Sequence, residues 1–115
     1  MLRIVREHLA DTVILRCFGR IVAGPEAESL KDAVACEADK RQVILDLAGV
    51  EAIDARGLGL LVFLQTLGSA LGFDLEVANP SPRVRELLGL TRLDSLLNIS
   101  HLQRAGEPMK EHAAA

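Results

Sequence analysis

Aromatic side chains are nearly absent from this sequence, which has three phenylalanines and neither tryptophan nor tyrosine among its 115 residues. The core must therefore be aliphatic, and a hydrophobic content of 50% is enough to build one. Surfaces that bind single-stranded nucleic acid stack bases on aromatic rings, and nucleic-acid-binding domains are usually basic. The missing rings and a net charge of −3 therefore argue against nucleic acid as a partner.

Disulfide, metal and membrane signals are missing too. Cys17 and Cys36 fit neither a disulfide framework nor a zinc motif, so we expect both to be reduced and mostly packed. The three histidines are far apart in the sequence and lack metal-ligand spacing. No hydrophobic run reaches the length of a membrane span, and the first residues do not resemble a signal peptide. We expect one cytoplasmic domain without a metal or direct membrane insertion.

Catalytic signatures are equally scarce. The sequence has no Gly-x-Ser-x-Gly elbow, no Walker loop and no dinucleotide fingerprint. Asp46, Glu51 and Asp54 are close in sequence, and paired carboxylates can perform acid–base chemistry. No nucleophile accompanies them. The position of Asp46 in the apolar run is explained if its carboxylate forms hydrogen bonds with nearby backbone at the end of the strand. We predict that the protein is not an enzyme and has no cofactor.

The sequence does contain alternating strand and helix patterns, which are typical of an α/β domain. Residues 2–9 and 12–18 predict two antiparallel strands, the second ended by Gly19. A continuous apolar run over 42–47 predicts a central strand covered on both faces, and 73–77 a strand with one wet face. Helices are predicted from the apolar spacing and from their starts, namely Pro25, Gly57, Ser81-Pro82 and a capping box at Thr91 and Asp94. A short strand is expected within 96–102.

The turn between the central strand and the next helix, residues 54–59, is the most informative stretch. Asp54 can cap the helix, and Gly57 and Gly59 allow another molecule to approach the main chain closely. Arg56 is unusual there, because a cation in the first turn opposes the helix dipole by roughly 0.3–1 kcal/mol. Either Arg56 recruits an anion to the helix N-terminus, such as a carboxylate, a nucleotide or a lipid phosphate, or it pairs with Glu51 or Asp54.

The helix over 57–71 has apolar residues on two sides of a helical wheel. One side is expected to pack on the sheet and comprises Leu60, Phe63, Leu64, Leu67 and Leu71. A surface helix needs only one apolar stripe, so the other group indicates a contact surface for a partner, unless another element of the domain covers it. That group comprises Leu58 and Val62, beside Gln65 and Ser69, with Leu61 at the edge.

Residues 43–50 (VILDLAGV) and 53–59 (IDARGLG) resemble the central signature of STAS domains, the family of bacterial anti-sigma factor antagonists. Residues 79–84 (NPSPRV) and 88–93 (LGLTRL) resemble its closing segments, so the resemblance covers about residues 1–101. It implies a mixed, mostly parallel sheet of four or five strands flanked by helices. We take 1–103 as the domain and 104–115 as a tail, which is either a loosely docked helix or residues added to the native chain.

In the antagonists that this sequence resembles, the residue after the motif aspartate is typically a serine or threonine. A serine kinase that doubles as the anti-sigma factor phosphorylates it, which adds about −1.5 to −2 charges. The matching residue here is Ala55, which has no hydroxyl group. The resemblance therefore implies a docking module for an anti-sigma factor or serine-kinase-type partner, without phosphorylation control at this turn.

The predicted partner-binding residues are those of the turn and of the second apolar group: Asp54, Ala55, Arg56, Gly57, Leu58, Gly59, Leu61, Val62 and Gln65. The alternatives are a STAS accessory subunit of a transporter or lipid-transport system, and a STAS module that binds an anion or nucleotide. A homodimer or larger assembly also remains open.

Overall fold

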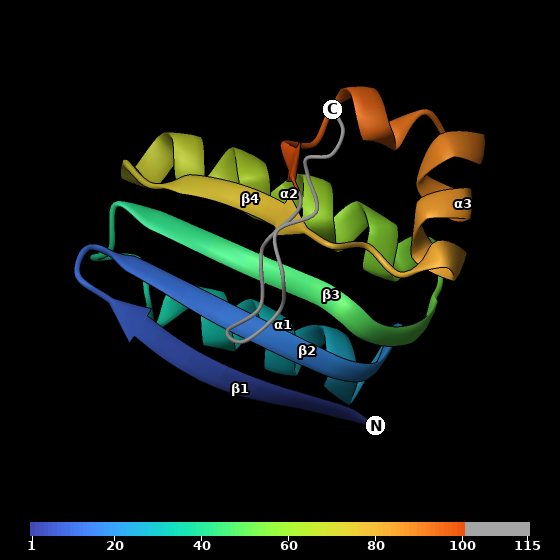
Figure 1. Ribbon diagram of the computed structural model, residues 1–115, viewed down its shortest axis with the longest axis horizontal. Helices are drawn as coiled ribbons and strands as arrows, with labels where there is room; N and C mark the ends of the chain where they lie inside the picture. Colours follow the sequence, from blue (N-terminus) through green and yellow to red (C-terminus); the bar gives the residue numbers. More distant parts are fainter. Residues whose placement is uncertain (101–115) are drawn as a thin grey trace, which may run out of the picture.

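Five strands form one mixed sheet in the order β1-β2-β3-β4-β5 in the computed structural model, which describes residues 1–100 (Figure 1). β1 runs antiparallel to β2, and β2 to β5 are mutually parallel. The predicted α/β class with a mixed, mostly parallel sheet is confirmed. The strands are β1 Leu2–Leu9, β2 Thr12–Ile21, β3 Gln42–Ile53, β4 Asp74–Ala78 and β5 Ile99–Ser100.

Helical connections join the parallel strands. The helices are α1 Pro25–Ala35, α2 Ala55–Leu71 and α3 Pro82–Leu90, followed by a short 3-10 helix, η1 Leu93–Ser95. α1 and α2 lie along the same face of the sheet, and α3 lies at one end of it (Figure 1). Their ends follow the predicted chemistry: Asp54 caps α2, Ser81 caps α3, and Gly72 ends α2 in the left-handed conformation with a φ of 95°.

The core is largely aliphatic, as the composition predicts, although it also includes the buried Phe73. Side chains alternate between the two faces of a strand, so Val43, Leu45 and Leu47 of β3 face the helices and are fully buried. Ile44 lies on the other face, in a small second cluster with Ile14 and Ala78.

The bounds of several elements differ from the prediction. β2 continues past Gly19 to Ile21, and β3 continues past Leu47 to Ile53. The two strands stay paired there through irregularities in their register. α3 runs through Gly89 to Leu90. Of the short strand expected within 96–102, the described residues contain only Ile99–Ser100 as a strand. The predicted tail, 104–115, lies outside the described residues.

The predicted capping box at Thr91 is wrong. The Thr91 hydroxyl donates back to the Leu87 carbonyl at 2.8 Å, so it closes the last turn of α3 rather than opening the next helix. Asp46 behaves as expected: its Oδ1 accepts from the Ala48 N–H at 3.0 Å. Its Oδ2 also accepts from Arg16 at 3.2 Å.

The predicted packing face of α2 is correct only in part, because Leu64 is fully buried and Leu60 and Leu67 pack against the core, but Phe63 and Leu71 do not. The buried face holds Leu58, Leu61 and Leu64, whereas the side chains of Phe63 and Leu71 are 49% and 55% exposed. Gly57 and Gly68 lie on the same buried face. At Gly68 a Cβ would lie 2.6 Å from the Phe73 carbonyl oxygen. The two glycines therefore bring α2 close to the rest of the chain, and that contact decides which side faces inward.

Neither cysteine is in a disulfide. Burial, with a smaller effect of the nearby Asp46 carboxylate, raises the pKa of the Cys17 thiol to about 12. Cys36 is exposed, contrary to the expectation that both are packed. Within residues 1–100, no helix is long and apolar enough to cross a membrane, and no group of acidic, histidine or cysteine side chains converges as metal ligands would.

Candidate functional site

The turn that begins α2 lies at the carboxyl ends of two neighbouring parallel strands, β2 and β3. This end of a parallel sheet is where α/β proteins commonly bind their ligands. The Asp54 N–H donates to the Ile21 carbonyl at 3.3 Å, which places the end of β2 directly beside the start of α2. α1 begins at Pro25, four residues after the end of β2 at Ile21, so the starts of α1 and α2 both lie at this edge of the sheet.

The Asp54 carboxylate holds these two helix starts together. Its Oδ1 accepts from the Gly57 N–H at 2.8 Å, which is the predicted cap of α2. Its Oδ2 accepts from the Ala23 N–H at 3.0 Å, in the loop before α1. These donors, Ala23 foremost and then Gly57, lower the pKa of Asp54 because they stabilise the ionised form. The sequence predicts the cap but gives no sign of the second bond.

The two glycines of the turn have different roles. A Cβ at Gly57 would lie 2.2 Å from the Ile21 carbonyl oxygen and 2.7 Å from Ile53 Cγ1, so the close approach at Gly57 is made by the chain itself. At Gly59 a Cβ would meet no atom of the described residues within 4 Å. Only Gly59 is therefore open to approach by another molecule.

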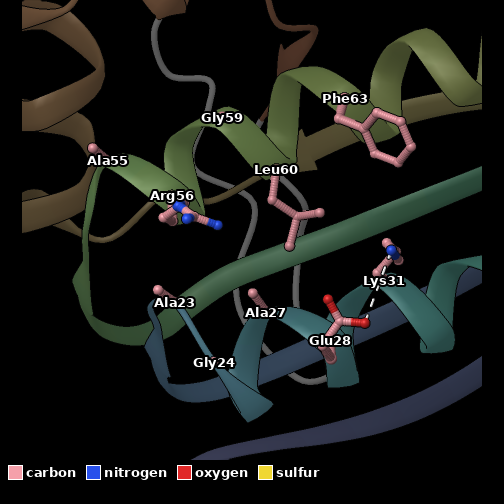
Figure 2. A pocket seen from close by; sticks show the side chains of 10 residues that line it. All are labelled: Ala23, Gly24, Ala27, Glu28, Lys31, Ala55, Arg56, Gly59, Leu60 and Phe63. Atoms are coloured by element: carbon pink, nitrogen blue, oxygen red, sulfur yellow. Dashed lines mark ion pairs between the residues drawn. The ribbon is translucent and has the colours of Figure 1, made fainter.

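A hollow of about 620 Å³ lies between the first turns of α1 and α2. Figure 2 shows Leu60 pointing between the two helices toward Ala27, with Phe63 farther along α2 and Arg56 at the mouth. The lining is mostly small or apolar, with charged residues on both helices: Ala23, Gly24, Ala27, Glu28, Lys31, Ala55, Arg56, Gly59, Leu60 and Phe63.

Arg56 makes no ion pair within the part of the chain that the structure describes. The predicted pairing with Glu51 or Asp54 is therefore wrong. Lys31, on the opposite wall, lies 3.8 Å from Glu28, and the two side chains are 44% and 67% exposed. The hollow thus has a cation on each wall, and Arg56 has no acidic partner among residues 1–100.

The structure divides the predicted partner-binding residues into an accessible and an internal group. Ala55, Arg56 and Gly59 are exposed, and Asp54 is partly exposed. Gly57 is buried, Leu58 is 7% exposed and Leu61 is fully buried, while Val62 packs against the core. The prediction that Leu58 and Leu61 form an accessible contact surface is wrong, because the sheet covers that side of α2.

Gln65 is also engaged by the chain itself. Its amide donates to the Leu96 carbonyl at 2.6 Å and accepts from the Asn98 N–H at 2.9 Å. The side chain thus ties α2 to the segment before β5. The sequence analysis missed the α1 wall, Ala23 to Lys31, although its Pro25 helix start follows a parallel strand just as the start of α2 does.

The two hydrogen bonds that the Asp54 carboxylate accepts predict that the stability of the fold depends on pH. Because its pKa is lowered in the folded state, Asp54 stabilises the fold above its unfolded pKa, and this contribution is lost as the pH falls through the folded pKa. Asp54→Asn should lower the melting temperature at pH 7, and the deficit should shrink on acidification, as measured by circular dichroism. Asp32→Asn is the control, because the Asp32 side chain is exposed; a deficit of the same size and pH profile there would contradict the assignment.

Comparison with known proteins gives the family. A protein from Pseudomonas aeruginosa (strain UCBPP-PA14) that is described as a STAS-domain containing protein is 30% identical to this chain over 60 residues. These residues are 52% of this chain and 59% of that protein. The match thus spans less than two thirds of that relative. A Thermotoga maritima crystal structure, described as a candidate anti-sigma factor antagonist, has a TM-score of 0.74 at 28% identity and covers 84% of this chain and 85% of its own.

The Bacillus anti-sigma factor antagonist SpoIIAA has the same fold. Its unphosphorylated form has a TM-score of 0.72 at 20% identity, covering 89% of this chain and 90% of its own. Its phosphorylated form has a TM-score of 0.68 at 18% identity, covering 89% and 93%. The STAS domain family model matches residues 3–105, so this chain belongs to the STAS domain family.

Proposed function

We propose that the protein is a non-catalytic regulatory module that docks on an anti-sigma factor or serine-kinase-type protein without phosphate control. The observation that carries the proposal is the exposed methyl group of Ala55 at the mouth of α2, beside an open hollow. Membership of the STAS family and the likeness to anti-sigma factor antagonists support the class of partner.

The turn offers no acceptor for a phosphoryl group. Residues 50–60 contain no serine, threonine or tyrosine, and Ala55 occupies the position next to the capping aspartate. A phosphate would add about −1.5 to −2 charges beside the Asp54 carboxylate and would repel an acidic partner. With alanine there, the docking surface keeps the same charge at all times.

The hollow supplies apolar contact area and positive charge. Phe63 is 49% exposed, and burying the rest of such a ring contributes on the order of 1 kcal/mol. Arg56 and Lys31 stand on the two walls (Figure 2). We therefore expect the docking segment of the partner to combine an apolar anchor for Leu60 and Phe63 with a carboxylate opposite Arg56.

A nucleotide or lipid phosphate is the less favoured ligand for the same place. Helix N-termini bind anions through their free N–H groups. Here the Asp54 carboxylate already accepts from Gly57 N–H and Ala23 N–H, so a negative charge occupies the helix mouth. A phosphate would have to approach that carboxylate, whereas a carboxylate on a partner can reach the exposed Arg56 from outside.

The test is a charge placed at position 55. The serine-kinase-type anti-sigma factors of the source organism would be purified one by one and their affinity measured by titration calorimetry. We expect one of them to bind the wild type, and Ala55→Glu to weaken that binding tenfold or more, which is about 1.4 kcal/mol. Ala55→Ser should bind as the wild type does and then lose affinity once the kinase has phosphorylated it.

Ala70→Glu is the matched control, because Ala70 is exposed on the same helix and does not line the hollow. It should leave the affinity unchanged. The proposal is wrong if none of these proteins binds the wild type, or if the two glutamate variants weaken binding equally. Phosphate detected by mass spectrometry within residues 50–60 of the wild type would also contradict it.

A further inference from the structure

The outer edge of β1 is free along its whole length within the described residues, because β1 ends the sheet and pairs only with β2. The strand is eight residues long and contains neither proline nor glycine. Long open edges of this kind are templates for pairing with another strand. On the face of the sheet away from the helices, Val5 and Leu9 are 41% and 49% exposed.

Alternation along β1 fixes which residues can make hydrogen bonds at that edge. The Met1 carbonyl accepts from the Arg20 N–H at 3.0 Å, and Leu9 flanks the tight turn to Thr12. In an antiparallel ladder the backbone groups of successive residues point to opposite sides. The odd-numbered residues therefore bond to β2, and Leu2, Ile4, Arg6 and His8 direct their N–H and carbonyl groups outward.

The charges of β1 match those of a second β1 in one antiparallel register. When Val5 lies opposite its own copy, Arg3 lies opposite Glu7 twice, and the outward pairs are Ile4 with Arg6 and Leu2 with His8. A shift by two residues in one direction places Arg3 opposite Val5, and in the other direction Arg6 opposite itself. Opposite charges directly across a strand pair stabilise it, and like charges destabilise it.

The surroundings of the edge allow this pairing. A hollow of about 340 Å³, lined by Ile4 and Arg6 of β1 and by residues of α1, separates the strand from the helix at this point. Arg6 and His8 both contact the buried Glu37 carboxylate, Arg6 Nε at 2.9 Å and His8 Nε2 at 3.2 Å. Glu37 compensates the charge of Arg6, so the two Arg6 side chains near the symmetry axis repel each other less.

We propose that two copies of this chain associate through their β1 strands, antiparallel and with Val5 on the two-fold axis, to form one continuous sheet. The interface shares no residue with the hollow between α1 and α2 and is independent of the proposed docking function. It is isologous, as closed dimers require.

The experiment tests the interface by reversing the charges of Arg3 and Glu7. Sedimentation velocity of the full chain across a dilution series should show a monomer–dimer equilibrium. R3E and E7R should each raise the dissociation constant roughly tenfold or more, because each places like charges opposite one another twice. An equimolar mixture of R3E and E7R should restore dimers, because each variant then meets the opposite charges. A wild type that stays monomeric throughout, or a mixture that behaves like the separate variants, would overturn the proposal.

R3E and E7R also remove contacts within the monomer, because Arg3 lies over the Phe18 ring at 4.7 Å and Glu7 pairs with Arg16 at 2.7 Å. A further variant that keeps these contacts is therefore needed. V5E places a carboxylate opposite Arg16 of the same hairpin, which favours the fold, and opposite its own copy in the dimer. It should dissociate the dimer while keeping the melting temperature. L90E, on the exposed end of α3, should leave the dimer intact; equal effects of V5E and L90E would rule out the β1 interface.

Discussion

Gly57→Ala is expected to destabilise the domain by about 3 kcal/mol, near the upper end for overpacking. The added methyl carbon would lie 2.2 Å from the Ile21 carbonyl oxygen and 2.7 Å from Ile53 Cγ1. A carbonyl oxygen of the main chain cannot rotate away as a side chain can, so either α2 or the end of β2 must shift. Urea denaturation followed by circular dichroism measures the change in the free energy of unfolding.

Gly59→Ala is the matched control, two residues farther along the same helix. Its methyl group would meet no atom within 4 Å in the part of the chain that the structure describes, so only the helix propensity changes. Alanine is favoured over glycine in a helix by about 0.8–1 kcal/mol, and we expect Gly59→Ala to stabilise the domain by up to this amount. If both substitutions shifted the stability in the same direction, the close contact at Gly57 would be refuted.

Leu58→Asp is expected to destabilise the domain severely, with a loss of about 4 kcal/mol or more. Leu58 is 7% exposed and belongs to the main core cluster, so an aspartate there would bury a charge without a partner. Small domains are stable by only about 5–15 kcal/mol, so a loss of this size is a large part of the total. Dispersion of amide signals in a nuclear magnetic resonance spectrum would report the loss of the fold.

Phe63→Asp separates the fold from the docking surface. The Phe63 ring is half exposed at the hollow, so we expect this variant to stay folded with a stability change of about 1 kcal/mol or less, but to lose affinity for the partner. If Leu58→Asp instead kept the wild-type melting temperature and lost only partner binding, Leu58 would be an accessible contact residue and α2 would be turned differently.

The order and type of the elements could be predicted from the sequence because each has its own local signal. β3 has a continuous apolar run, α3 has a serine cap followed by proline, and α2 ends at Gly72. The orientation of α2 could not be read from the same rules, because apolar residues occur on nearly every side of it. The usable signal was glycine: Gly57 and Gly68 mark where the helix touches the chain most closely.

The candidate site was predictable only on one wall. Asp54, Ala55, Arg56 and Gly59 follow a strand directly, and their exposure agrees with the turn that the sequence indicates. The other wall comes from the preceding crossover, about 30 residues earlier in the chain, and its nearness depends on the parallel pairing of β2 with β3. The hydrogen bonds of Gln65 could not be predicted, because their partners, Leu96 and Asn98, are distant in sequence.

The two hydrogen bonds of the Asp54 carboxylate have a consequence for the rate at which a partner associates. With one oxygen on Gly57 and the other on Ala23, a single carboxylate fixes the relative position of the two walls before any partner arrives. A receptor whose walls are already in place loses little conformational entropy on complex formation. Recognition at this hollow should therefore resemble rigid-body docking, with encounter and orientation rather than loop rearrangement setting the association rate.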